Sequence, residues 1–285
     1  MDADPRTAWL EGRLVPWAEA RLPLEDRAVQ FSESLYEVVA VTAGRPRGVA
    51  EHTARMKRAA SVLGLGDGVP GARAWERIVA ELIRSEQVEE GLLYAQVTGG
   101  SAPRRFLPAR APRARFFAYL RRHRFPRREE TARGIRAISL PDPRWDRSDL
   151  KTTMLLPAVL AKREAARRGA AEAILLGPAE RVREGASSTV FIVEGRRILS
   201  PEPTPHTLPG TTAPLVARLA REAGLEAADS TITLPRLLAA NEVFVTATSL
   251  LVMPLAEVDG KAIGEGRGGP VALDLAARLR AWYEI

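Results

Sequence analysis

Lys151 is the residue whose type and position most clearly allow chemistry in this chain. Only four lysines occur, and every other basic residue apart from the histidines is arginine. Lys151 follows a polar turn and leads into a long apolar run, so we expect its amine to be partly removed from water. Removal from water favours the neutral amine, which is a nucleophile. The alternative is a strand-end lysine whose ammonium group reaches solvent, and position alone favours that alternative.

The other three lysines have ordinary structural explanations. Lys57 lies within an arginine-rich helical stretch, where a solvated side chain is expected. Lys162 shares a polar helix face with several arginines, and Lys261 follows the Asp259-Gly260 turn at a hairpin tip. Lys151 therefore stands apart from the other lysines.

The remaining rare residues exclude several kinds of site. The absence of cysteine excludes disulfides, a thiolate nucleophile and Cys-ligated metals. His52, His123 and His206 do not pair at the spacing of metal ligands, so no metal site is predicted. A Ser-His-Asp triad stays open, but no G-x-S-x-G elbow is present, and neither G-x-x-x-x-G-K-[ST] nor G-x-G-x-x-G occurs.

Glu184 is a carboxylate that suits a cofactor held by a lysine. It lies in RVREGASSTVFIV, before a turn of small residues and a strand, which allows its side chain to face inward. A lysine that carries pyridoxal phosphate needs such a carboxylate to keep the pyridine nitrogen of the cofactor protonated. The alternative for Glu184 alone is an ordinary glutamate in a turn.

Two pairs of hydroxyl side chains offer places for a phosphate group. Gly210 permits close backbone approach, and Thr211 and Thr212 follow it at an expected helix start, where N–H groups lack helical partners. A proline in the first turn supports that helix start. Thr248 and Ser249, which end the strand EVFVTATS, form the second pair. A plain helix cap explains the first pair equally well.

The hydrophobic pattern predicts an α+β protein with mixed strands rather than regular βαβ alternation. A hairpin is expected at residues 8–17, and a helix with an apolar stripe is expected around residues 75–83. Further strands are expected at 35–42, 92–100, 113–121, 135–140, 171–176, 188–195, 196–201, 242–249 and 250–260, and further helices at 51–66, 155–168, 211–224, 235–240 and the C-terminal end.

The length of 285 residues and 46% hydrophobic content indicate a sizeable core in one large or two modest domains. We predict a small N-terminal α/β domain at residues 1–120 and an interdomain linker at 121–133, a charged stretch that contains a proline. A larger C-terminal domain at residues 134–285 would carry Lys151.

Several sequence blocks occur in an order that resembles a known family. They are LYEVVAV, EHTARM, RWDRSDLKTTMLL, EAILL, EGASSTVFIVEG, LPGTTA, EVFVTATSLLVMPL and DGKAIGEGRGGPV. Over about residues 14–263 the chain resembles the class IV aminotransferases, the fold-type IV pyridoxal-phosphate enzymes. These include D-amino-acid aminotransferases, branched-chain aminotransferases and aminodeoxychorismate lyase. The resemblance implies a two-domain α+β fold with the cofactor between the domains.

The resemblance also implies roles for the candidate residues. Lys151 would form the Schiff base with pyridoxal 5'-phosphate and shuttle the proton, and Glu184 would pair with the pyridine nitrogen. Tyr36 would line the substrate pocket. The phosphate would be bound by Arg55, by Gly210, Thr211 and Thr212 at the helix start, and by Thr248, with Ser249 facing the phosphate or the substrate carboxylate.

Within the family, YEVV and the compact length look most like the D-amino-acid branch. That branch has a P-R-x-H block that binds the substrate α-carboxylate, and the matching stretch here is APRRFLP. Arg104 keeps the arginine, whereas Phe106 replaces the histidine. The resemblance implies that Arg104 or Arg105 binds the carboxylate, from the partner subunit as in the family; the alternative is that both are arginines of a surface loop.

Three further positions depart from the family pattern. Gly99 replaces the arginine of T-R-G, Ser32 to Ser34 replace G-D-G, and Thr189 replaces an asparagine. We expect the chain to bind the cofactor despite these changes. They do not indicate which substrate it uses.

The expected activity is transamination between an amino acid, with D-alanine favoured, and an α-keto acid. The alternatives are aminodeoxychorismate lyase, a branched-chain or (R)-amine aminotransferase of the same fold, and a relative or unrelated binding protein without chemistry. The family implies a homodimer with shared active sites. The net charge of +7 comes from dispersed arginines without a recognition motif, which argues against nucleic acid. No membrane span or signal core is visible, and a cytoplasmic location is expected.

Overall fold

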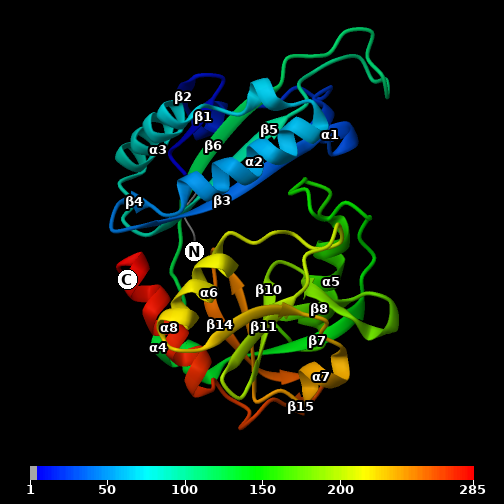
Figure 1. The fold of residues 1–285 in the computed structure, drawn as a ribbon. Coiled ribbons are helices and arrows are strands. Elements are labelled where there is room, and N and C mark those ends of the chain that lie inside the picture. Colours follow the sequence, from blue (N-terminus) through cyan, green and yellow to red (C-terminus); the bar gives the residue numbers. More distant parts are fainter. Residues whose placement is uncertain (1–4) are drawn as a thin grey trace. The chain divides into compact units, whose positions relative to one another are not determined.

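The computed structural model describes residues 5–285, which form two compact units (Figure 1). Unit 1 contains residues 5–124 and the short segment Leu150–Met154, and unit 2 contains Phe125–Asp149 and Leu155–Ile285. Within the described part, no helix is long and apolar enough to cross a membrane.

Unit 1 is an antiparallel sheet with helices packed on one face. Its six strands run in the order β2-β1-β6-β5-β3-β4. The elements are β1 (Thr7–Leu10), β2 (Arg13–Pro16), η1 (Trp17–Glu19), α1 (Arg27–Phe31), β3 (Ser34–Thr42), β4 (Arg45–Pro46), α2 (Val49–Leu63), η2 (Gly66–Gly68), α3 (Ala72–Glu86), β5 (Gly91–Thr98) and β6 (Arg115–Arg122).

The core of unit 1 lies between this sheet and the helices α2 and α3. The predicted stripe of α3 is confirmed, because Trp75, Ile78, Val79 and Leu82 are all buried in it. Alternate residues of β3, β5 and β6 face the same core, which is the period-2 burial expected of a sheet covered on one side. The opposite face of these strands carries the tyrosines described below.

Unit 2 is a nine-stranded mixed sheet in the order β12-β11-β10-β13-β14-β7-β8-β9, with β15 paired to β14. Its elements are α4 (Arg128–Arg133), β7 (Ile135–Pro141), α5 (Leu156–Arg167), β8 (Glu172–Leu176), η3 (Pro178–Glu180), β9 (Val182–Gly185), β10 (Thr189–Glu194), β11 (Arg197–Pro201), α6 (Thr212–Glu222), β12 (Glu226–Ser230), α7 (Leu234–Leu238), β13 (Glu242–Ala247), β14 (Leu251–Val258), β15 (Lys261–Ala262) and α8 (Pro270–Tyr283).

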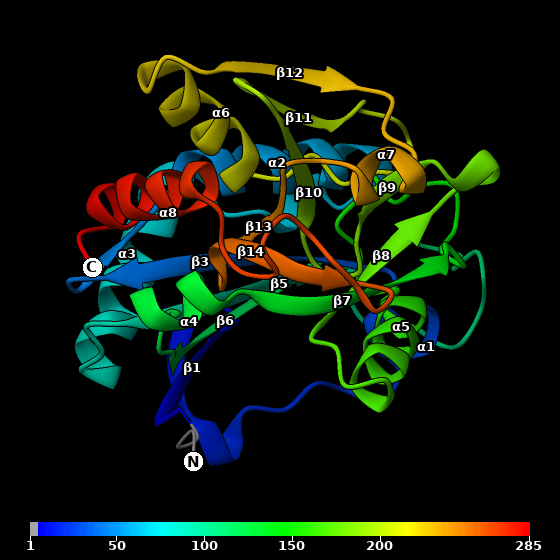
Figure 2. The same ribbon diagram turned by 90° about the horizontal axis from the view of Figure 1, so that it is seen from below.

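Neighbouring strands of unit 2 pair both in parallel and antiparallel. β7 pairs in parallel with β8 and β14, whereas β10 and β13 are antiparallel. Helices α6 and α8 pack against each other and against β13, and Figure 2 shows them side by side, α6 in yellow and α8 in red. The predicted α+β class with mixed strands is confirmed.

The segment that carries Lys151 belongs to unit 1, whereas the residues before and after it in the chain belong to unit 2. Residues 150–154, which the sequence-based division placed in the C-terminal domain, cluster with unit 1. The predicted linker at 121–133 contains the end of β6 and the helix α4. The predicted domain boundaries stay a prediction.

Candidate functional site

The backbone of Lys151 is held against strand β3 of unit 1. The N–H of Tyr36 donates to the Lys151 carbonyl oxygen at 3.1 Å, and the N–H of Thr153 donates to the Ser34 carbonyl oxygen at 3.2 Å. Thr152 forms an antiparallel bridge with Leu35. These contacts leave the lysine side chain half-buried, with its Nζ 4.4 Å from the centre of the Tyr36 ring.

Tyr36 is the first of a row of aromatic rings on the face of the unit 1 sheet opposite its core. Its ring stacks on Tyr94 at 5.6 Å, and Tyr94 stacks on Tyr119 at 5.1 Å. Burial, together with the neighbouring Tyr119 and Tyr36, raises the pKa of Tyr94 far above its usual value. The phenol of Tyr94 therefore stays neutral and donates to Gln96 Oε1 at 2.8 Å. The Lys151 amine thus borders a row of stacked tyrosine rings.

Arg55 lies in a buried cluster of charged and titratable groups with Glu37 and His52. The guanidinium forms two hydrogen bonds with the carboxylate, Nε to Oε1 at 2.8 Å and Nη2 to Oε2 at 2.6 Å. His52 Nδ1 lies 2.7 Å from Glu37 Oε2. Burial alone would raise the pKa of Glu37, but the hydrogen bonds from Arg55 and His52 outweigh burial and lower it to about 2.

Glu184 lies in β9 of unit 2 and is only 5% exposed. It forms an ion pair with Arg144, and its Oε2 accepts the N–H of Leu208 at 3.1 Å. Arg144 also binds Asp142, which Arg183 contacts at 3.0 Å. Burial alone would raise the pKa of Asp142, but hydrogen bonds from Arg144 and Arg183 outweigh it and lower that pKa. Glu184 is therefore a preoriented carboxylate in a paired network.

The start of helix α6 lies against Thr189, the first residue of strand β10, in unit 2. A Cβ added at Gly210 would lie 2.7 Å from the hydroxyl oxygen of Thr189, so a larger residue would force that hydroxyl to move. Thr189 is paired in register with Thr246. Thr246 is 2% exposed, and its hydroxyl has no hydrogen-bond partner in the part of the chain that the structure describes. Buried hydroxyls are normally paired, so this one suits a bound acceptor.

The candidate residues Thr248 and Ser249 lie in the turn that joins β13 to β14. The turn is closed by the N–H of Leu250, which donates to the Ala247 carbonyl oxygen at 3.2 Å. Leu251, the next residue, is buried and has a positive φ of 59°. A left-handed leucine is costly, and such strain persists where surrounding contacts enforce it. The turn is thus held in one shape beside the strand that carries Thr246.

The chemistry of the groups in each unit, considered separately, fits a phosphorylated pyridine cofactor. Unit 2 supplies a helix start that a side chain would block, hydroxyls at Thr211, Thr212, Thr246 and Thr248, and a buried carboxylate at Glu184. Unit 1, taken by itself, contains an amine at Lys151 and a buried guanidinium at Arg55. A helix start with hydroxyls is a common anion site, and a lysine with a carboxylate is what pyridoxal phosphate requires.

The predicted substrate residues Arg104 and Arg105 are exposed in the loop that joins β5 to β6. The ring of the neighbouring Phe106 contacts the ring of Phe31, with 5.4 Å between the ring centres. The structure therefore brings Lys151 together with Tyr36 in unit 1, and Gly210 together with Thr189 in unit 2.

Sequence reasoning missed several partners of the predicted residues. Glu37 directly follows Tyr36, and His52 lies one helical turn before Arg55, so the i,i+3 spacing on α2 was an available signal. Arg144 is the first residue of the block RWDRSDL but is far from Glu184 in the chain. No local pattern indicates that pair.

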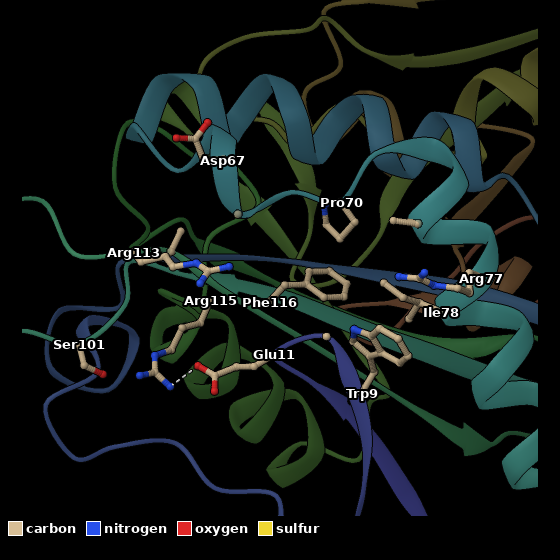
Figure 3. A pocket seen from close by; sticks show the side chains of 14 residues that line it. Trp9, Glu11, Asp67, Pro70, Arg77, Ile78, Ser101, Arg113, Arg115 and Phe116 are labelled. Atoms are coloured by element: carbon tan, nitrogen blue, oxygen red, sulfur yellow. Dashed lines mark ion pairs between the residues drawn. The ribbon is translucent and has the colours of Figure 1, made fainter.

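A separate cavity of about 680 Å³ opens in unit 1, and none of the predicted site residues lines it in the described part of the chain. Its floor contains Trp9 and Phe116, and the ion pair of Arg115 with Glu11 lies at one side (Figure 3). Arg113 lies beside that pair. The cavity is therefore distinct from the residues considered above.

The chain was compared with known proteins. Residues 34–258 match the family described as amino-transferase class IV. The D-alanine aminotransferase of Bacillus licheniformis is 34% identical over 269 residues, which cover 94% of each chain. The D-alanine aminotransferase of Staphylococcus haemolyticus is 31% identical over 277 residues, which cover 97% of each chain.

Solved structures of aminotransferases are also similar to this chain. The branched-chain aminotransferase of the archaeon Thermoproteus uzoniensis, with norvaline, superposes with a TM-score of 0.87 at 26% identity, over 97% of our chain and 94% of its own. The T.th. branched-chain amino acid aminotransferase complexed with N-(5'-phosphopyridoxyl)-L-glutamate has a TM-score of 0.89 at 26% identity. This second match covers 98% of our chain and 94% of that chain.

The chain belongs to the class IV aminotransferase family. It is a pyridoxal-phosphate-dependent enzyme that transfers an amino group between an amino acid and a keto acid. The predicted family, fold class, enzyme class and cofactor are thereby confirmed.

The buried cluster around Glu37 gives a pH-dependent contribution to stability. Because the pKa of Glu37 is lowered from 4.5 to about 2, its contribution is complete above pH 4.5 and is lost as the pH falls to about 2. We expect a contribution on the order of 3 kcal/mol. Urea denaturation between about pH 6 and pH 2 should show the Glu37→Gln variant destabilised at pH 6 and less sensitive to acid than wild type.

Glu76→Gln, at an exposed position of α3, is the matched control and should keep the wild-type pH profile. Parallel profiles for wild type and Glu37→Gln would contradict the assignment.

Proposed function

We propose that this aminotransferase uses a D-amino acid, with D-alanine first, as amino donor and an α-keto acid as acceptor. The main support is that relatives named D-alanine aminotransferase match nearly the whole chain at 30–34% identity. The site agrees, since one lysine amine is held beside an aromatic wall in unit 1.

Pyridoxal phosphate, when bound, supplies a carbonyl carbon to which amines add and a protonated ring that accepts electrons from the substrate. In this proposal Lys151 Nζ is the attachment point and afterwards the group that takes and returns the substrate α-proton. Its backbone bonds to β3 fix the Cα, so only the flexible side chain moves. The Tyr36 ring, 4.4 Å from Nζ, limits water on one side of the amine.

Glu184 is the proposed partner of the cofactor ring nitrogen. The ion pair with Arg144 and the Leu208 N–H restrict this carboxylate to one orientation. The proposed phosphate ligands are Arg55, the α6 start with Gly210, Thr211 and Thr212, and the turn residue Thr248. Ser249 faces the phosphate or the substrate carboxylate in this proposal.

The substrate would contact Tyr36 and one of the loop arginines, Arg104 or Arg105. A guanidinium is suited to a carboxylate because its planar N–H groups form two parallel hydrogen bonds. Phe106, which stands where the D-amino-acid branch of the family has a histidine, has no hydrogen-bonding group, so carboxylate recognition rests on these arginines.

We also propose a cytoplasmic homodimer. Leu24, Val29, Phe106 and Leu107 of unit 1 are 86%, 61%, 80% and 88% exposed, which is unusual for large apolar side chains. A second copy that covers them would remove this surface from water. Sedimentation equilibrium should give twice the chain mass, and Phe106→Asp with Leu107→Asp should shift the protein toward the monomer. A wild-type monomer at micromolar concentration would refute the dimer.

Substitution of Lys151 tests the assigned chemistry. Lys151→Ala should lower transamination by about 10²–10⁴-fold, because a positioned proton-transfer group is lost. The measurement is pyruvate formed from D-alanine with α-ketoglutarate as acceptor. Lys57→Ala, at an exposed position of α2, should keep wild-type activity. Transamination retained by Lys151→Ala would sink the assignment.

A panel of amino donors tests the substrate. We expect D-alanine to give the highest kcat/KM among D-alanine, L-leucine and an aromatic primary amine, each with pyruvate or α-ketoglutarate as acceptor. A preference for L-leucine or for the amine would assign the enzyme to another branch. Formation of p-aminobenzoate from aminodeoxychorismate would identify the lyase instead.

A further inference from the structure

The loop that carries Arg104 and Arg105 has few attachments to the rest of unit 1. It follows the end of β5 at Thr98 and leads to the start of β6 at Arg115, and its three prolines lack an N–H. Within the described residues, positions 103–112 form only two hydrogen bonds, and both come from Arg27. Arg27 therefore supplies the hydrogen bonds that hold this part of the loop to unit 1.

The Arg27 guanidinium donates hydrogen bonds both to backbone carbonyl oxygens of the loop and to the carboxylate of Glu33. Nη1 donates to the carbonyl oxygen of Arg105 at 2.8 Å, and Nη2 donates to the carbonyl oxygen of Phe106 at 3.1 Å. Nε donates to Glu33 Oε2 at 2.7 Å. Two consecutive loop carbonyls are thus bound by one planar group, which orients the backbone on both sides of Phe106.

The charge of Arg27 is buried and locally neutralised. Arg27 is 5% exposed, and a buried guanidinium is tolerated only when paired and hydrogen-bonded. Glu33 supplies the negative charge next to Arg27. A lysine could not replace Arg27, because a point charge cannot bond to Glu33 and both carbonyls in one plane.

Phe31, at the end of α1, adds an apolar attachment for the same loop. The Arg104 guanidinium lies 5.3 Å from the centre of the Phe31 ring, and the Arg27 guanidinium lies 4.8 Å from it. The ring of Phe106 also contacts Phe31. One ring of α1 therefore contacts the loop residues on both sides of Arg105.

Gly99 leaves room for the pairing of Glu33 with Arg27. A Cβ added at Gly99 would lie 2.7 Å from Glu33 Oε1 and 3.0 Å from its Cδ. Any larger residue at position 99 would displace the carboxylate that pairs with Arg27. The glycine that breaks the family pattern at this position is thus tied to the glutamate that breaks it at position 33.

We propose that Arg27 is a positioning residue that sets the substrate-carboxylate loop, with Glu33 and Phe31 as its supports. The inference rests on the proposed function, in which Arg104 or Arg105 binds the carboxylate. A loop that is ordered before substrate arrives avoids the cost of ordering it on binding. Arg27 touches no substrate in this scheme and acts through the loop.

The decisive variants are Arg27→Leu, Arg27→Lys and Gly99→Ala, each measured as the holoenzyme. We expect KM for D-alanine to rise about tenfold in Arg27→Leu and less in the other two, because loop hydrogen bonds are lost or misdirected. We expect kcat to stay within about twofold and the affinity for pyridoxal phosphate, measured by absorbance titration, to be unchanged.

Trypsin gives a readout that is independent of activity. Cleavage after Arg104, Arg105 and Arg110, mapped by mass spectrometry, should be about tenfold faster in Arg27→Leu than in wild type, because the loop is released. Arg236→Lys is the matched control. Arg236 also bonds to a carboxylate, Glu194, and to a backbone carbonyl, that of Thr231, but in unit 2. The Arg236→Lys variant should change neither KM for D-alanine nor the rate of loop cleavage.

Each outcome decides the proposal. A raised KM together with faster loop cleavage supports it, and Gly99→Ala and Arg27→Lys provide the test if Arg27→Leu does not fold. Unchanged cleavage in all folded variants overturns the anchoring. Faster cleavage with unchanged KM overturns the link to substrate. If wild type does not use D-alanine, the proposed substrate fails, and the same variants are then measured with the best donor of the panel.

Discussion

The pairing of the Lys151 segment with strand β3 is the contact on which the position of the proposed catalytic lysine depends. Residues 150–154 leave unit 2, lie along unit 1 and return to unit 2. Two backbone hydrogen bonds and one bridge hold this short excursion. They place the lysine to which we assign the chemistry next to Tyr36, in a part of the chain that otherwise has no regular structure.

Three buried ion pairs in this protein each lie within one unit. Glu37 pairs with Arg55, Arg27 with Glu33, and Glu184 with Arg144. Each pairing offsets the cost of removing a charge from water. Each also fixes the direction of a group for which the family resemblance, or our proposal, gives a functional role, so one arrangement serves folding and positioning together.

The departures from the family pattern have local physical explanations. Gly99 makes room for Glu33, and Glu33 neutralises Arg27. Thr189, in place of an asparagine, contacts the Gly210 position and is paired with Thr246. Phe106, in place of a histidine, loses a polar group and gains a ring contact with Phe31. These changes lie in the loop proposed to bind the substrate and near the proposed phosphate ligands rather than at the lysine.

The sequence by itself determined the elements with strong local patterns, such as the apolar stripe of α3. The ordered sequence blocks predicted the family and its cofactor. Strand β12 was not visible, because its sequence EAADS is polar and it exists by pairing with β11. Only the tertiary structure decided which charges meet, since Arg144 and Glu184 are 40 positions apart, and Arg27 and the Arg105 carbonyl are 78 positions apart. Periodicity and capping report on neighbours within a turn or a strand pair, whereas such partners are selected by the route of the whole chain.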